Sequence, residues 1–178
     1  MTVADISAVL EGPIRQIGYV VRDLDAAMQS WYRLGVGPWF TMRKLEQQGR
    51  YRGELCEPTI SLAFANSGPM QVELIEPHGD TASIYREFLD AGGHGYHQLA
   101  WWVDDFDTMM QKAAVAGWPI VWSGESGDTR FVYFELDPRI STVVEVMELT
   151  DTTRGLADLV AGAADDWDGV TDPVRSLL

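Results

Sequence analysis

The sequence has few cysteines and few basic residues, and each shortage excludes a class of protein. Cys56 is the only cysteine among 178 residues, which excludes an internal disulfide and a zinc cluster built of cysteines. This fits a reducing compartment, so we expect a cytoplasmic protein. Lys and Arg number 13 against 27 Asp and Glu, giving a net charge of −14. Because an acidic surface repels phosphate backbones, we expect no nucleic-acid partner.

Long apolar runs are also missing. No stretch of about 18 apolar residues occurs, so we expect no membrane-spanning helix. The N-terminal residues carry no basic stretch before a short apolar segment, which is not the pattern of a secretory signal. The chain is nevertheless 46% apolar and 22% charged, as globular proteins are. Its length suits one well-buried domain or two small modules that share a core.

The chain contains an internal repeat, which bears directly on its architecture. QIGYVVRDLDAAM at 16–28 and QLAWWVDDFDTMM at 98–110 align without gaps, and VELIE at 72–76 aligns with VEVME at 144–148. The first pair stands 82 residues apart and the second pair 72, so the second copy is shorter by a ten-residue loop deletion. Such self-similarity predicts two copies of one supersecondary unit.

Both copies show the same order of local signals. An apolar strand (14–21 or 96–103) leads to an aspartate, Asp23 or Asp105, that is suited to cap a helix. Each helix ends near a glycine. The strands expected next are 38–46, 56–65 and 70–76 in the first copy and 118–123, 129–136 and 142–149 in the second. Each copy is therefore predicted to be a βαβββ module, which makes the fold class α+β.

The remaining segments connect or flank these modules. We expect an N-terminal segment (1–13), a first module (14–80), a connecting helix (81–93), a second module (94–149), and a C-terminal helix with an acidic tail (150–178). Leu156, Leu159 and Val160 fall on one face of the terminal helix, and the acidic residues after it predict a mobile tail.

Four polar residues occupy equivalent positions in the two copies of the repeat. Gln16 and Gln98 occupy equivalent points of the first strands, and Glu73 and Glu145 occupy equivalent points of the last strands. If the modules pair about a pseudo-twofold axis, two carboxylates and two amide oxygens converge as ligands for a divalent cation. A glutamate of the set is also able to take a proton. The alternative is structural: taken singly, such residues more often face solvent or satisfy buried hydrogen bonds.

Three segments resemble the vicinal oxygen chelate superfamily, which contains glyoxalase I, methylmalonyl-CoA epimerases, extradiol dioxygenases and bleomycin-resistance proteins. They read IRQIGYVVRDLDAAMQSW, VELIEPHGDTASIYREFLDAGGHGYHQLAWWVDDFD and LDPRISTVVEV. The middle segment is similar to methylmalonyl-CoA epimerases. The resemblance implies tandem βαβββ modules that form a curved mixed sheet around a central metal cavity, and a homodimer is common in similar proteins.

The resemblance transfers to this chain residue by residue. Glu73 and Glu145 match the two last-strand metal ligands, and Gln16 stands where epimerases have His and one glyoxalase I class has Gln. The family's His-His pair is His97-Gln98 here, so Gln98 replaces the fourth ligand. Ser61 matches the position of the epimerases' first-module glutamate base. The missing histidines argue against extradiol oxygen chemistry.

Aromatic residues are frequent near the predicted cavity. Strand alternation places Trp102 on the same side as Gln98, and Trp39, Phe40 and Phe64 lie on strands that would form the walls. We include these residues and Ser61 as candidate substrate contacts, the alternative being ordinary core packing. An aromatic pocket suits a small hydrophobic molecule.

Two functions follow from these observations. The first is a metal-dependent isomerase, epimerase or lyase that moves a proton next to a carbonyl, with Glu145 or Glu73 as the proton carrier. The second is a non-catalytic binding protein of the bleomycin-resistance type, favoured by the loss of a histidine ligand at Gln98. A weaker third is a scaffold that assembles as a dimer.

Overall fold

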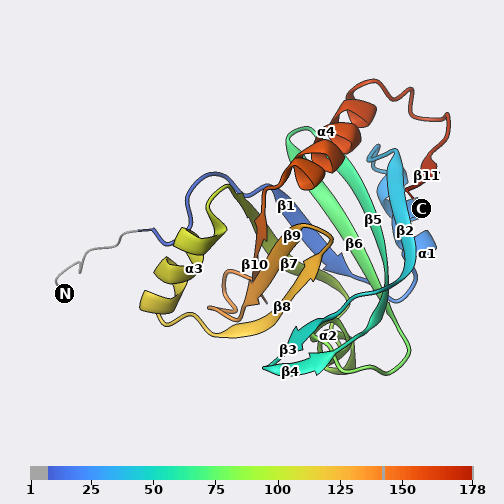
Figure 1. Ribbon diagram of the computed structural model, residues 1–178. Helices are drawn as coiled ribbons and strands as arrows, with labels where there is room; N and C mark the ends of the chain where they lie inside the picture. The colour runs from blue at the N-terminus through green and yellow to red at the C-terminus, as the bar shows by residue number, and fades with distance from the viewer. Residues whose placement is uncertain (1–7, 142, 178) are drawn as a thin grey trace.

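In the computed structural model, residues 8–141 and 143–177 are described, and they form one mixed sheet with four helices (Figure 1). Three parts of the predicted segments lie outside these ranges: residues 1–7 of the N-terminal segment, residue 142 of the last strand and residue 178 of the tail. Among the described residues, no helix is both long and apolar enough to cross a membrane.

The helices and strands have the following bounds. The helices are α1 (Leu24–Tyr32), α2 (Ile84–Asp90), α3 (Phe106–Val115) and α4 (Asp151–Asp165). The strands are β1 (Gln16–Val20), β2 (Trp39–Glu46), β3 (Gly49–Tyr51), β4 (Glu54–Cys56), β5 (Thr59–Ser67), β6 (Met70–His78), β7 (Gly95–Val103), β8 (Ile120–Ser126), β9 (Thr129–Phe134), β10 (Val143–Glu148) and β11 (Val174–Ser176). Their order across the sheet is β11-β2-β5-β6-β1-β7-β10-β9-β8-β3-β4.

The predicted repeat is confirmed as two βαβββ modules. The first consists of β1, α1, β2, β5 and β6, and the second of β7, α3, β8, β9 and β10. The modules meet where β1 and β7 pair antiparallel, and in each module the last strand pairs parallel with the first. Gly18 lies opposite Glu73 in one module, and Ala100 lies opposite Glu145 in the other. The register therefore keeps the symmetry of the repeat.

The helix starts form as the local signals predict. Asp23 accepts the Ala26 backbone N–H at 2.9 Å, and Asp105 accepts that of Thr108 at 2.9 Å. These side chains satisfy N–H groups that have no partner within a helix's first turn. The two caps therefore direct α1 and α3 away from equivalent strands of the sheet.

Two elements depart from the prediction. The hairpin β3–β4 interrupts the first module and pairs through β3 with β8, so a segment of the first module extends the edge of the second. The acidic tail is not free: β11 pairs parallel with β2, and Leu177 donates its backbone N–H to Thr41 O at 2.9 Å. The prediction of a mobile tail is wrong for these residues because sheet pairing at an edge holds them.

Helix α4 lies over one side of the curved sheet, next to β5 (Figure 1). Val160 is fully buried and packs with Phe40 and Phe64, while Leu156 supports the same cluster. Leu159, predicted to share the apolar face, is 49% exposed. The packing of α4 places its first turns over the cavity described next.

Candidate functional site

The curved sheet and α4 enclose a cavity of about 220 Å³. Both modules contribute to its wall, and so does the N-terminal half of α4. Three of the four predicted ligands, Gln16, Glu73 and Glu145, line this cavity. Its other lining residues are Met42, Gln47, Leu62, Phe64, Gln71, Tyr85, Trp102, Ser126, Thr129, Phe131, Tyr133, Met147, Thr152, Thr153, Leu156 and Ala157.

Gln98, the fourth predicted ligand, is fully buried and bonds to both carboxylates. Its Nε2 atom donates to Glu145 Oε2 at 2.9 Å and lies 3.2 Å from Glu73 Oε2. The structure therefore brings all four predicted residues to one place.

Gly18 makes this arrangement possible. It lies opposite Gln98 in the β1–β7 pair and opposite Glu73 in the β1–β6 pair. A Cβ atom at this position would come within 2.5 Å of the Gln98 side chain. The missing side chain thus leaves the space in which Gln98 extends across β1 to the other module's carboxylate.

Strand β7 contains a bulge at His97, the residue before Gln98. The register shifts between Gly18 and Tyr19, which face Gln98 and Tyr96, so His97 is the extra residue. Its Nδ1 atom lies 2.6 Å from Gln98 Oε1, and its ring packs edge-on against Phe88 at 4.9 Å. Burial lowers the pKa of His97 to about 4, so the ring is neutral at pH 7.

Burial raises the pKa of both carboxyl groups. Burial is the main cause at Glu73, where repulsion from Glu145 adds to the rise. Burial also raises the pKa of Glu145, but hydrogen bonds with Gln98 and Tyr133 oppose the rise. Among the described residues that line the cavity, none is Lys, Arg or His. The pair therefore requires a proton or a bound cation to offset its charge.

These residues fit a divalent cation that prefers oxygen ligands. No group of three or more His, Cys, Asp or Glu side chains suited to a metal occurs in the described part of the chain. A cation at this site would therefore depend on the two glutamines as well as on Glu73 and Glu145. The Gln16 Nε2 atom already donates to Gln71 Oε1 at 2.7 Å, so Gln16 would offer its amide oxygen.

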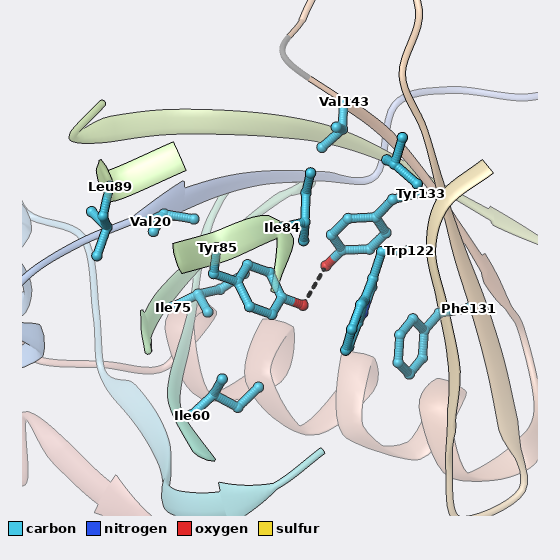
Figure 2. Packing of buried hydrophobic residues seen from close by; sticks show 11 residues of the cluster. Val20, Ile60, Ile75, Ile84, Tyr85, Leu89, Trp122, Phe131, Tyr133 and Val143 are labelled. Carbon is cyan, nitrogen blue, oxygen red and sulfur yellow. Dashed lines mark hydrogen bonds between the residues drawn. The ribbon is translucent and has the colours of Figure 1, made fainter. Parts of the chain in front are cut away.

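Two tyrosines of the cavity were missed as site residues by sequence reasoning. The Tyr85 and Tyr133 hydroxyls lie 3.1 Å apart (Figure 2), and Tyr133 Oη accepts the Gln98 amide N–H at 2.9 Å. Tyr133 stands opposite Glu145 in the β9–β10 pair, a relation that only the strand register reveals. Tyr85 comes from α2, outside both repeats, where no pattern indicated a role.

The predicted aromatic contacts divide into two groups. Trp102 and Phe64 line the cavity. Trp39, Phe40 and Ser61 are not among its lining residues, because Trp39 packs on the α1 side of the sheet and Phe40 packs with Val160 of α4. Ser61 alternates with Leu62 on β5, and its hydroxyl lies 2.7 Å from His78 Nε2. Strand alternation thus separates neighbours that the sequence grouped together.

Solved structures with the same fold support this architecture. Methylmalonyl-CoA epimerase from Mycobacterium tuberculosis is 21% identical, with a TM-score of 0.54 over 80% of this chain and 91% of that one. A hypothetical protein from Bacillus halodurans is 17% identical, with a TM-score of 0.57 over 78% and 95%. A methylmalonyl-CoA epimerase in complex with methylmalonyl-CoA and NH4+ is 19% identical, with a TM-score of 0.50 over 78% and 94%.

Sequence comparison gives the family. No curated protein sequence matches the chain significantly. A family profile described as the glyoxalase/bleomycin resistance protein/dioxygenase superfamily matches residues 15–134, which include both first strands and most of both modules. The chain belongs to the glyoxalase/bleomycin resistance protein/dioxygenase superfamily.

Proposed function

We propose that the protein is a metal-assisted isomerase, epimerase or lyase that transfers a proton next to the carbonyl of a small hydrophobic or aromatic substrate. The observation that carries this proposal is the pair Glu73 and Glu145, two buried carboxyl groups that face one cavity with raised pKa values. A carboxylate whose pKa lies closer to neutrality is a more effective proton acceptor and donor at pH 7.

Each residue has a defined role in this proposal. Glu73, Glu145, Gln16 and Gln98 would hold the divalent cation, which when bound would act as a Lewis acid toward a substrate oxygen. Glu145 takes the proton from the substrate carbon, because Gln98 and Tyr133 keep this carboxylate ionised more readily than Glu73. The surrounding side chains exclude water, which strengthens these electrostatic interactions.

The wall of the cavity favours an uncharged substrate group. Phe64, Trp102 and Phe131 supply aromatic surface, and the volume of about 220 Å³ suits a small molecule. A second cavity of about 540 Å³ adjoins the first and shares Gln71, Trp102 and Ala157 with it. A longer substrate would extend there, past Arg15, whose guanidinium lies 5.0 Å from the centre of the Trp102 ring.

The similar solved structures include methylmalonyl-CoA epimerases, so a coenzyme A thioester is one candidate substrate. We favour a smaller carbonyl compound for two reasons. No described residue that lines the cavity of about 220 Å³ is basic, and Ser61, at the position of the epimerases' first-module glutamate base, is not part of its wall. One pair of carboxyl groups therefore has to perform the proton transfer.

Metal content tests the proposal most directly. Protein purified without a His-tag or chelator should contain about one divalent ion per chain by elemental mass spectrometry. Glu73→Gln and Glu145→Gln should lose the ion, whereas Glu135→Gln, on the exposed side of the Arg52 ion pair, should keep it. Protein without metal after incubation with nickel, cobalt, manganese, zinc and iron would refute the proposal.

A non-catalytic binding protein is the second candidate. It is favoured by the Gln98 amide nitrogen, which lies between the two carboxylates and offsets part of their charge without a cation. In that case an aromatic ligand should quench the tryptophan fluorescence of the protein, through Trp102 in the cavity wall, with equal affinity in the presence and absence of EDTA. A homodimer and a cytoplasmic location remain predictions, and light scattering would test the first.

A further inference from the structure

The orientation of the Gln98 amide decides whether this residue can contact a cation. Its Nε2 atom faces Glu73, Glu145 and Tyr133, all at hydrogen-bonding distance. An ionised carboxylate only accepts hydrogen bonds, and a protonated carboxyl group still accepts at its other oxygen, so an amide N–H suits both groups in a cation-free site. A cation between the same carboxylates requires the amide oxygen in this place instead. Rotating the terminal amide by half a turn exchanges the two atoms.

That rotation also reverses what Gln98 presents to His97. At present Gln98 Oε1 lies 2.6 Å from His97 Nδ1, and an amide oxygen only accepts, so Nδ1 carries the proton. After the rotation an amide N–H would face Nδ1, which must then be the unprotonated nitrogen. A neutral imidazole satisfies either arrangement, because its one N–H proton resides on Nδ1 or on Nε2.

The surroundings of His97 leave the second nitrogen available for this exchange. His97 is fully buried, and its Nε2 atom has no hydrogen-bond partner among the described residues. Phe88 and Tyr85 pack against the ring, so no neighbouring hydrogen bond at Nε2 locks the tautomer. The only polar contact of the ring that the described residues show is therefore the one with Gln98.

We propose that His97 is a positioning residue whose neutral tautomer changes when a divalent cation binds, allowing the Gln98 amide to exchange its nitrogen for its oxygen at the two carboxylates. This inference rests on the proposed function, since it concerns the same cation. The ring loses the proton at Nδ1 and gains one at Nε2 by exchange with water, so its charge does not change. His97 itself does not contact the cation.

Nitrogen NMR of protein with ¹⁵N-labelled histidine tests the exchange without any substrate. In the metal-free protein His97 should show a protonated Nδ1 and an unprotonated Nε2. Saturation with Mg²⁺, or with Zn²⁺ in a second titration, should interchange the two ring shifts. His78, held by Ser61, and His94 serve as internal controls and should keep their shifts. The His97→Gln spectrum identifies the His97 signals.

Calorimetry of the same samples separates the possible results. Cation binding with an interchange of the His97 shifts supports the inference. Cation binding with unchanged His97 shifts, or a protonated Nε2 in the metal-free protein, overturns the inference and leaves the proposed function intact. No binding of any divalent cation overturns the proposed function and the inference together.

A matched pair of variants gives an independent readout. His97→Gln retains a neutral group that can donate or accept at this place, whereas His97→Met retains the volume but does neither. His97→Met should bind the cation about tenfold more weakly, because the rotated Gln98 amide then buries an N–H without a partner. His97→Gln should stay close to the native affinity. Equal affinities in the two variants would contradict a positioning role.

Discussion

The two halves of the site are equivalent in sequence but differ in their surroundings. Glu73 lies opposite Phe64 in its module, and Glu145 lies opposite Tyr133 in the other. Glu145 therefore has a hydroxyl beside it where Glu73 has an apolar ring. Gln98 donates to Glu145 at 2.9 Å and lies 3.2 Å from Glu73. The backbone register is thus equivalent in the two modules, but the two carboxyl groups have different neighbours.

This difference separates the acidities of the two carboxyl groups. Burial raises both pKa values, but only the pKa of Glu145 is lowered again by hydrogen bonds. In the cation-free protein Glu73 holds a proton more readily, so Glu145 is the carboxylate that is ionised and available to act as the base. Two carboxyl groups whose environments separate their pKa values are able to take different roles in proton transfer.

The largest expected effect concerns the base of this pair. Glu145→Gln should lower the exchange of substrate α-protons with D₂O at least about a hundredfold, because an amide does not accept the proton. Proton NMR of a panel of small carbonyl compounds measures this exchange. Circular dichroism should show an unchanged fold. Full exchange in this variant would remove Glu145 from the proposed mechanism.

The second prediction concerns Gly18, which lies where the two modules pair. Gly18→Ala should lower the free energy of unfolding by about 2 kcal/mol, since its Cβ would collide with the Gln98 side chain. Urea denaturation measures this loss. Gly162→Ala is the matched control: it lies in α4 with open space around its Cβ position, and it should be neutral or stabilising.

The third prediction uses pH. Because the folded-state pKa values of Glu73 and Glu145 are raised, the folded state binds more protons than the unfolded state above the ordinary value of 4.5. Their contribution to stability is present below that value and is lost as pH rises through the folded pKa values. The free energy of unfolding of the metal-free protein, measured by urea denaturation, should therefore fall as pH rises from 5 through about 7 and beyond, by at most about 1.4 kcal/mol per pH unit for each of the two groups.

The control for this slope is Glu73→Gln, which removes the more perturbed group. The variant should show a clearly flatter pH dependence and greater stability than the native chain at alkaline pH. An unchanged slope would show that the buried pair does not set the pH response.

The smallest expected effect comes from making the two halves alike. Tyr133→Phe gives Glu145 the same neighbour as Glu73 and should raise the pKa of Glu145, because a hydrogen bond to its carboxylate is lost. It should also lower stability by about 1 kcal/mol. Carbon NMR of the labelled carboxyl groups measures the titration. The opposite change, Phe64→Tyr, should lower the pKa of Glu73, and no shift in either variant would contradict this account of the asymmetry.

Much of the fold was predictable because its signals are local. Alternating apolar residues and the capping residues Asp23 and Asp105 each act over a few neighbouring residues, and the repeat shows these local signals twice in the same order. Strands β3, β4 and β11 escaped prediction, since each has only three residues, and β3 and β11 are held by pairing with distant strands. Short strands of this kind carry too little pattern of their own.

The candidate site was predictable in its members more than in its geometry. The repeat placed Gln16, Gln98, Glu73 and Glu145 at equivalent positions, and the structure brings them together. Tyr85 had no signal, because it lies on the helix between the modules. Of the predicted aromatic residues, Trp39 and Phe40 are not among the lining residues, because alternation and packing under α4 direct their rings elsewhere.

The sequence by itself determined the two βαβββ modules and the equivalence of their polar residues, since hydrophobic periodicity, caps and repeats are properties of the chain's local order. Only the tertiary structure decided how those residues interact. The space at Gly18, the bulge at His97 and the hydroxyl of Tyr133 beside Glu145 depend on strand register between distant segments. A shift of one residue in that register would move the side chains of a strand to the other face of the sheet. No local pattern therefore reveals these three features.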